Sequence, residues 1–121
     1  METSPALVRL VEASCQPCHS KTDILSTDRI EQYLSQIPGW QLDNNSQQGP
    51  RIRRTFIGKD FDQCVDMVCE IRKVAQKENH HPEIHLTRYK YLEVVIQTFA
   101  VNNLTINDFI LAAKIDACLS S

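Results

Sequence analysis

The fold follows from residues 78–98, which read ENHHPEIHLTRYKYLEVVIQT. Proline disfavours helical backbone at the residue before it, so the preceding helix is expected to end before His81. Residues 83–86 and 89–98 then predict two strands joined by a short turn. Since successive residues of a strand face opposite sides, one face of the longer strand carries Leu92, Val94, Ile96 and Thr98. The stretch therefore predicts a helix followed by a β-hairpin.

Upstream of this hairpin, the sequence predicts a long amphipathic helix. Asp60 is a good N-cap for it, and apolar residues then recur at three- and four-residue steps. The predicted inward stripe consists of Phe61, Cys64, Val65, Val68, Ile71, Val74 and Ala75. Residues 40–42 and 51–57 predict a second hairpin before this helix. A further helix, with Asp28 as its predicted cap, is stopped by Pro38-Gly39.

A last helix is predicted after Thr105-x-x-Asp108, which has the form of a capping box. Its predicted inward residues are Ile106, Phe109, Ile110, Ala113 and Ala117. The resulting order, α-β-β-α-β-β-α, predicts an α+β fold in which a four-stranded antiparallel sheet carries three helices on one face. We expect residues 26–121 to form this domain. Residues 1–25 are expected to be an N-terminal leader that is partly disordered or docks only on a partner.

Composition excludes several classes of protein. The 121 residues are 42% hydrophobic and 23% charged, which is typical of a globular domain and not of a disordered chain. A net charge of −2 gives no bulk electrostatic case for binding nucleic acid or an anionic membrane. Apolar runs are too short to span a bilayer, and the N-terminus lacks the pattern of a secretory signal. We therefore expect a cytoplasmic protein.

Five cysteines are present, an odd number that favours reduced thiols over a disulfide framework. Cys15-Gln16-Pro17-Cys18-His19 matches the spacing of a c-type haem attachment site. Covalent haem attachment requires an exported chain, and zinc requires about four ligands, for which no second ligand pair is evident. A plain turn in the leader is therefore favoured over either cofactor.

Three of the four histidines lie between His80 and His85. Imidazole is the side chain whose ordinary pKa lies near neutrality, so neighbouring histidines can serve as an acid and a base. Two other interpretations stay open: solvated histidines that complement the negative end of a helix, and a metal site. Adjacent residues in extended backbone face opposite sides, which makes His80 and His81 a poor chelating pair. Asp108 likewise has a plainer role, as the acidic member of the capping box.

These residues resemble the pterin-4a-carbinolamine dehydratase family. The resemblance covers about residues 15–118 and is carried by residues 78–86, Tyr89, Thr98, residues 104–116, residues 37–40, residues 54–56 and the Cys15-x-x-Cys18 leader. Two adjacent histidines before a proline, with an aspartate downstream, form its most specific part. We therefore expect the α+β fold of this family, assembled as a homodimer or homotetramer.

The resemblance also implies an activity. Members of the family remove water from 4a-hydroxytetrahydropterins and regenerate quinonoid dihydropterin during tetrahydrobiopterin recycling, with neither metal nor cofactor. By position, His80, His81 and Asp108 would be catalytic. The substrate would be lined by Asn79, His80, His81, Gln97, Thr98 and Phe99.

Two single positions and one loop depart from the family pattern. Gln76 stands where an acidic residue is common, Phe99 stands where a third histidine is common, and Asn102-Asn103 occupy a loop that usually carries glycines. Phenylalanine can stack on a pterin ring but cannot transfer a proton. A second hypothesis therefore stays open, in which the chain has lost catalysis and acts as an assembly factor of the Rubisco type or as a transcriptional dimerisation cofactor.

Overall fold

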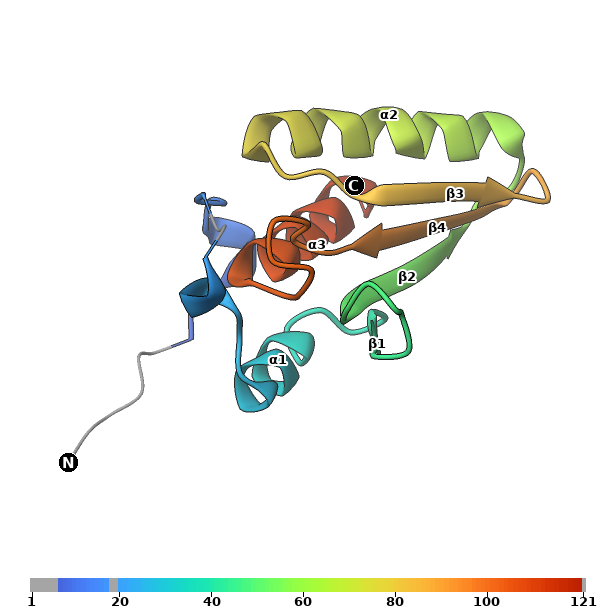
Figure 1. Ribbon diagram of the computed structural model, residues 1–121. Coiled ribbons are helices and arrows are strands. Elements are labelled where there is room, and N and C mark those ends of the chain that lie inside the picture. The colour runs from blue at the N-terminus through green and yellow to red at the C-terminus, as the bar shows by residue number, and fades with distance from the viewer. Residues whose placement is uncertain (1–6, 18–19, 121) are drawn as a thin grey trace.

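The computed structural model describes residues 7–17 and 20–120. Two short 3₁₀ helices, η1 and η2, precede three α-helices and four strands (Figure 1). Their bounds are η1 Leu10–Glu12, η2 Lys21–Asp23, α1 Thr27–Leu34, β1 Gln41–Asp43, β2 Arg51–Ile57, α2 Phe61–Glu78, β3 Glu83–Thr87, β4 Tyr91–Ile96 and α3 Ile106–Leu119. The predicted element order is thereby confirmed.

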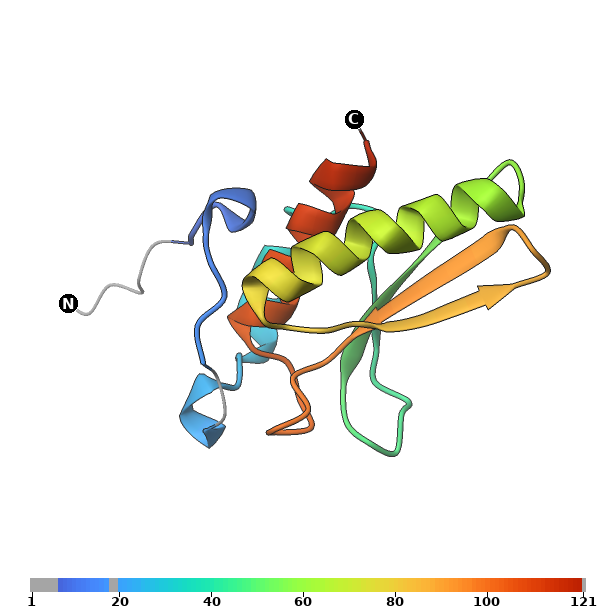
Figure 2. The ribbon, with the colours of Figure 1, turned by 90° about the horizontal axis from the view of Figure 1, so that it is seen from above.

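The four strands form one antiparallel sheet in the order β1-β2-β4-β3. Each predicted hairpin is present, and the two hairpins join through β2 and β4, where Ile52 pairs with Ile96. Figure 2 shows α2 crossing over the sheet, and α2 also packs against α3. An α+β sheet with helices on one face was the predicted fold class, and the structure confirms it.

The core lies between the sheet and the helices. Leu92, Val94 and Ile96 of β4 are fully buried there, as the alternation in the sequence predicts. The first two turns of α3 are buried on nearly all sides, and η1 packs against the same helix. Leu10 of η1 belongs to the same core and is 1% exposed. The described part of the leader therefore packs on the domain of its own chain.

Several details of the sequence-based expectations are wrong. The cap of α1 is Ser26, whose hydroxyl accepts the Arg29 N–H, and not Asp28. Phe61 and Val65 are exposed, whereas Cys64 between them is fully buried. Ala117 is exposed as well, near the free end of α3.

The β3–β4 turn is longer than predicted. It extends to Lys90, since Arg88 and Tyr89 both adopt left-handed backbone. Two predicted caps are present: Asp60 accepts the Gln63 N–H, and Thr105 with Asp108 forms a capping box.

Candidate functional site

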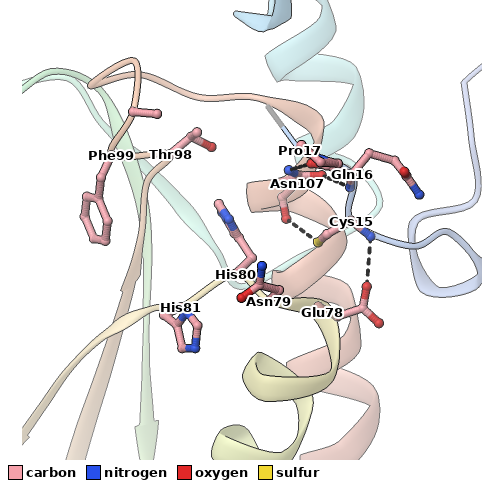
Figure 3. Close-up of a pocket in the computed structure, with 11 residues that line it drawn as sticks. Cys15, Gln16, Pro17, Glu78, Asn79, His80, His81, Thr98, Phe99 and Asn107 are labelled. Atoms are coloured by element: carbon pink, nitrogen blue, oxygen red, sulfur yellow. Dashed lines mark hydrogen bonds between the residues drawn. The ribbon is translucent and has the colours of Figure 1, made fainter. Parts of the chain in front are cut away.

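A cavity of about 380 Å³ lies where the C-terminal end of α2, the segment after β4, the start of α3 and the leader meet (Figure 3). This volume is within the range of small-molecule sites. The lining residues are Cys15, Gln16, Pro17, Glu78, Asn79, His80, His81, Thr98, Phe99, Ala100 and Asn107. Five of the six residues predicted to line a substrate are thus brought together.

The backbone at the end of α2 brings both histidines to this cavity. Asn79 ends the helix with φ 52° and ψ 41°, a left-handed conformation that asparagine tolerates better than most residues. The His80 N–H still donates to Ala75 O, at 3.2 Å. The chain therefore reverses tightly at Asn79 before it enters β3. His80 and His81 both line this cavity, but their rings point in different directions and have different partners, Asp108 for His80 and Gln76 for His81 (Figure 3).

His80 is anchored to a buried carboxylate. Its Nε2 lies 2.7 Å from Asp108 Oδ1, and the Asp108 side chain is fully buried. The second oxygen of Asp108 accepts the Thr98 hydroxyl and the Thr105 N–H, each at 2.9 Å. Burial raises the pKa of Asp108 above its ordinary value, and the hydrogen bonds from His80, Thr105 and Thr98 oppose that rise. The carboxylate is thus held in one position by three donors, one of which is His80.

His81 has a different environment. Its side chain is exposed, and its Nε2 lies 2.6 Å from Gln76 Oε1. Gln76 is the position at which the family commonly has an acidic residue, so a neutral amide oxygen here replaces a carboxylate as the acceptor. Because this oxygen can only accept, His81 carries a proton on Nε2 and Nδ1 is its remaining ring nitrogen. The two histidines therefore differ in both burial and partner.

Phe99 lines the cavity from the other side without filling it. Its side chain is 62% exposed, and Figure 3 shows its ring across the cavity from the leader residues, with His80 between them. In the loop that follows, Asn102 adopts left-handed backbone with φ 48°, which asparagine tolerates better than most residues. The cavity is therefore open, with an aromatic face on one side and two imidazoles beside it.

Gln97 is not among the residues that line this cavity. It is buried, and its amide donates to Gln48 O and Pro50 O. His85 lies on β3, where its ring is paired with Glu83 at 3.1 Å. Of the five-residue leader motif, Cys18 and His19 lie outside the described residues. Among the residues described, no group of three His, Cys, Asp or Glu side chains is arranged to hold a metal ion.

The leader contributes a side of the cavity that the sequence did not predict. Cys15, Gln16 and Pro17 lie there, together with Glu78 and Asn107 of the helix ends. Burial, with the nearby carboxylates of Glu78 and Asp108, raises the pKa of the Cys15 thiol to about 12, so this thiol stays neutral. In the sequence, only the polar side chains of Glu78 and Asn107 at two helix ends could have indicated that the leader contacts this cavity.

Comparison with known proteins gives a consistent result. The family described as pterin 4 alpha carbinolamine dehydratase matches residues 23–118. A relative from Hydrogenovibrio crunogenus that carries the name of this family is 39% identical, over 93% of this chain and 96% of that protein. The mitochondrial pterin-4-alpha-carbinolamine dehydratase 2 of Arabidopsis thaliana is 35% identical, over 92% of this chain and 59% of that protein.

A solved structure has the same fold. It is the crystal structure of a Brucella melitensis protein described as a transcriptional coactivator/pterin dehydratase. The TM-score is 0.70 at 27% identity, and the match covers 78% of this chain and 97% of that one. No helix among the described residues is both long and apolar enough to cross a membrane.

Proposed function

The chain belongs to the pterin-4a-carbinolamine dehydratase family, and on that premise we propose that it dehydrates 4a-hydroxytetrahydropterins to quinonoid dihydropterins. The observation that carries this proposal is the pairing of His80 with the buried Asp108 in a cavity that His81 also lines. Such a reaction would serve tetrahydrobiopterin recycling.

The chemistry needs one proton donor and one proton acceptor. The C4a–O bond breaks as the hydroxyl leaves with an added proton, and the N5–H electrons form the C4a=N5 double bond as the N5 proton is removed. Water and the quinonoid product account for all atoms. Each proton transfer by a positioned side chain contributes typically about 10²–10⁴-fold in rate.

His80 suits the role of base. With Nε2–H donated to Asp108, the neutral ring keeps a lone pair on Nδ1, which can take the N5 proton. The imidazolium that forms would be stabilised by the Asp108 carboxylate 2.7 Å away. Asp108 is then a positioning residue, and Thr98 and Thr105 hold it in place.

His81 suits the role of acid. It is exposed, so its charged form keeps most of its hydration, and the Gln76 oxygen accepts from Nε2. Protonated His81 can donate from Nδ1 to the departing hydroxyl. The Phe99 ring offers a flat apolar face on which the bicyclic pterin can stack. Asn79 and Thr98 would line the substrate beside these groups.

The test is turnover of a 4a-hydroxytetrahydropterin by the purified protein, measured above the spontaneous rate of dehydration. His81→Ala should lower the rate by about 10²–10⁴-fold. His85→Ala is the matched control, because this histidine lies on β3 outside the cavity, and it should leave the rate unchanged. Equal rates for the wild type and His81→Ala would reject the proposal.

A scaffold role is the second candidate. Ile57, Phe61 and Val65 are 70%, 55% and 39% exposed at the end of β2 and the start of α2, which is where a partner protein could bind. A partner protein that co-purifies stably with this chain from the native host would support this role. A clean homo-oligomer from that host would count against it.

We also propose assembly as a homodimer or homotetramer in the cytoplasm. β3 is an edge strand of the sheet, and an unpaired edge favours pairing with a second copy. Cys15, Cys64 and Cys69 form no disulfide, which fits a reducing compartment. Light scattering of the purified protein measures its subunit number, and a monomer at micromolar concentration would contradict the assembly.

A further inference from the structure

The side of the cavity formed by Cys15, Gln16 and Pro17, here termed the leader wall, is held by specific hydrogen bonds. The Cys15 N–H donates to Glu78 Oε1 at 2.8 Å. Asn107 engages the Gln16 backbone twice, since its Oδ1 accepts the Gln16 N–H at 3.0 Å and its Nδ2 donates to Gln16 O. Three bonds therefore fix two successive residues of the wall.

Both anchors are buried groups that would be costly to leave unpaired. The Glu78 side chain is 4% exposed, and its second oxygen accepts from Lys114 Nζ at 2.9 Å. Burial acts to raise the pKa of Glu78, but the bond from Cys15 and the ion pair with Lys114 outweigh it and bring that pKa below its ordinary value. Asn107 is 4% exposed. Loss of one partner would leave a buried polar group without a hydrogen bond, which is destabilising.

The anchors also fix the wall relative to the histidines. Glu78 is the last residue of α2, two positions before His80, and Asn107 is the neighbour of Asp108 on α3. The same two helix ends therefore carry the His80–Asp108 pair and the anchors of the wall. A ligand that meets His80 has the wall at a constant position beside it.

The chemistry of the wall suits an uncharged part of the ligand. The Cys15 thiol stays neutral, with its sulfur 3.6 Å from Asn107 O, and the Pro17 ring is apolar. Figure 3 shows Cys15 on the opposite side of His80 from the Phe99 ring. In a pterin, C6 is bonded directly to N5, so the C6 substituent begins two bonds from the nitrogen that must meet a histidine. A C6 substituent therefore lies beside the histidine that meets N5, and the leader wall flanks His80 on the side away from Phe99 (Figure 3).

We propose that the leader wall selects the C6 substituent of the pterin, and that Glu78 and Asn107 are the residues that position this wall. The inference rests on the proposed function, since it assumes that a pterin occupies the cavity. It assigns the leader a part in substrate choice, separate from the histidines that move protons.

Binding of two stable ligands tests the wall directly. The probes are 7,8-dihydrobiopterin, with a dihydroxypropyl group at C6, and 6-methyl-7,8-dihydropterin, each measured by titration calorimetry. Cys15→Leu adds bulk to the wall and should raise Kd for the longer ligand about tenfold or more, since one methylene in a tight pocket changes affinity by about 10–200-fold. The methyl ligand should change by less than about threefold. Cys69→Leu, on the exposed face of α2, is the matched control and should alter neither Kd.

A second variant tests the anchors without changing the wall itself. Asn107→Asp loses the donor to Gln16 O and places a carboxylate beside that carbonyl. We expect Cys15 to react several-fold faster with iodoacetamide, as mapped by mass spectrometry, and Kd for dihydrobiopterin to change more than Kd for the methyl ligand. Asn45→Asp, in an exposed turn, is the control.

Equal changes in the two Kd values, or no change in either variant, overturn the inference. So does a wild-type protein that binds neither ligand. Selective binding without turnover rejects the proposed dehydratase activity and leaves the leader wall standing. Turnover with unselective binding rejects the wall alone, so the two failures are distinguishable.

Discussion

Asp108→Asn is the substitution that isolates the proposed role of the buried carboxylate. Asparagine has nearly the same shape as aspartate but has one acceptor oxygen in place of two. The two oxygens of Asp108 serve three donors, namely His80 at 2.7 Å and Thr98 and Thr105 at 2.9 Å each. The single oxygen of the asparagine side chain therefore cannot accept from all three donors.

The Thr105 N–H determines how the asparagine side chain is oriented, because a peptide nitrogen can only donate. If the amide oxygen faced His80, the amide NH₂ would point at the Thr105 N–H, and two donors would meet. The oxygen is therefore expected to take the place of Oδ2, which turns the NH₂ toward His80 Nε2. That nitrogen can accept only when the His80 proton moves to Nδ1. The variant should thus hold His80 in the tautomer that has no lone pair on Nδ1.

The expected result is a loss of about 10²–10⁴-fold in the rate of dehydration, the usual value for removing a general base. Stability should fall by no more than about 1–3 kcal/mol, because a neutral hydrogen bond replaces a charged one while the cost of burying the charge is removed. The assay is turnover above the spontaneous rate, with thermal unfolding to verify the fold. Asp116→Asn, on α3 beside Trp40 and away from the cavity, is the control and should retain the rate. A rate within about threefold of the wild type for a folded Asp108→Asn would refute the role given to this carboxylate.

Three further predictions concern the rest of the cavity and the loop near it. Phe99→His places an imidazole on the open side of the cavity and should raise the dehydration rate by about tenfold or more, whereas no change would mean that this position does not reach the substrate. The pKa of Glu78 is lowered in the folded chain, so this carboxylate stabilises the leader fully above its ordinary pKa of 4.5 and loses that effect as the pH falls through the lower folded pKa. The Cys15 amide should therefore lose protection from hydrogen exchange over that pH range. Constant protection would contradict the prediction. Gly49→Ala should destabilise the fold by at least about 1–3 kcal/mol in a denaturant titration, because φ is +98° there and a Cβ would lie 1.9 Å from Asn102 O; the exposed Gln47→Ala is its control, and equal midpoints would refute the reasoning.

Local signals predicted most of the fold. Alternation in residues 89–98 placed Leu92, Val94 and Ile96 in the core, and proline and glycine marked the ends of elements correctly. The errors arose where tertiary packing determines which side chains are buried. Phe61 and Val65 have the spacing of the inward stripe of α2, yet both are exposed while Cys64 is fully buried, and no local pattern reports this difference.

For the candidate site, too, local signals predicted some residues and missed those that depend on tertiary packing. His80, His81 and Asp108 were predicted from residue types and from the family resemblance; the two histidines line one cavity, and the buried Asp108 contacts His80 from behind it. The leader wall could not be predicted, because the contact between Gln16 and Asn107 joins residues 91 positions apart. Gln97 has the position of a lining residue in the sequence, yet its amide holds a neighbouring loop.

The most direct test is a crystal structure of the protein with 7,8-dihydrobiopterin. The account predicts the bicycle stacked on the Phe99 ring, N5 next to the His80 ring, C4a next to the His81 ring, and the C6 substituent against Cys15 and Pro17. A ligand bound elsewhere, or a cavity that stays empty at saturating ligand, would contradict it.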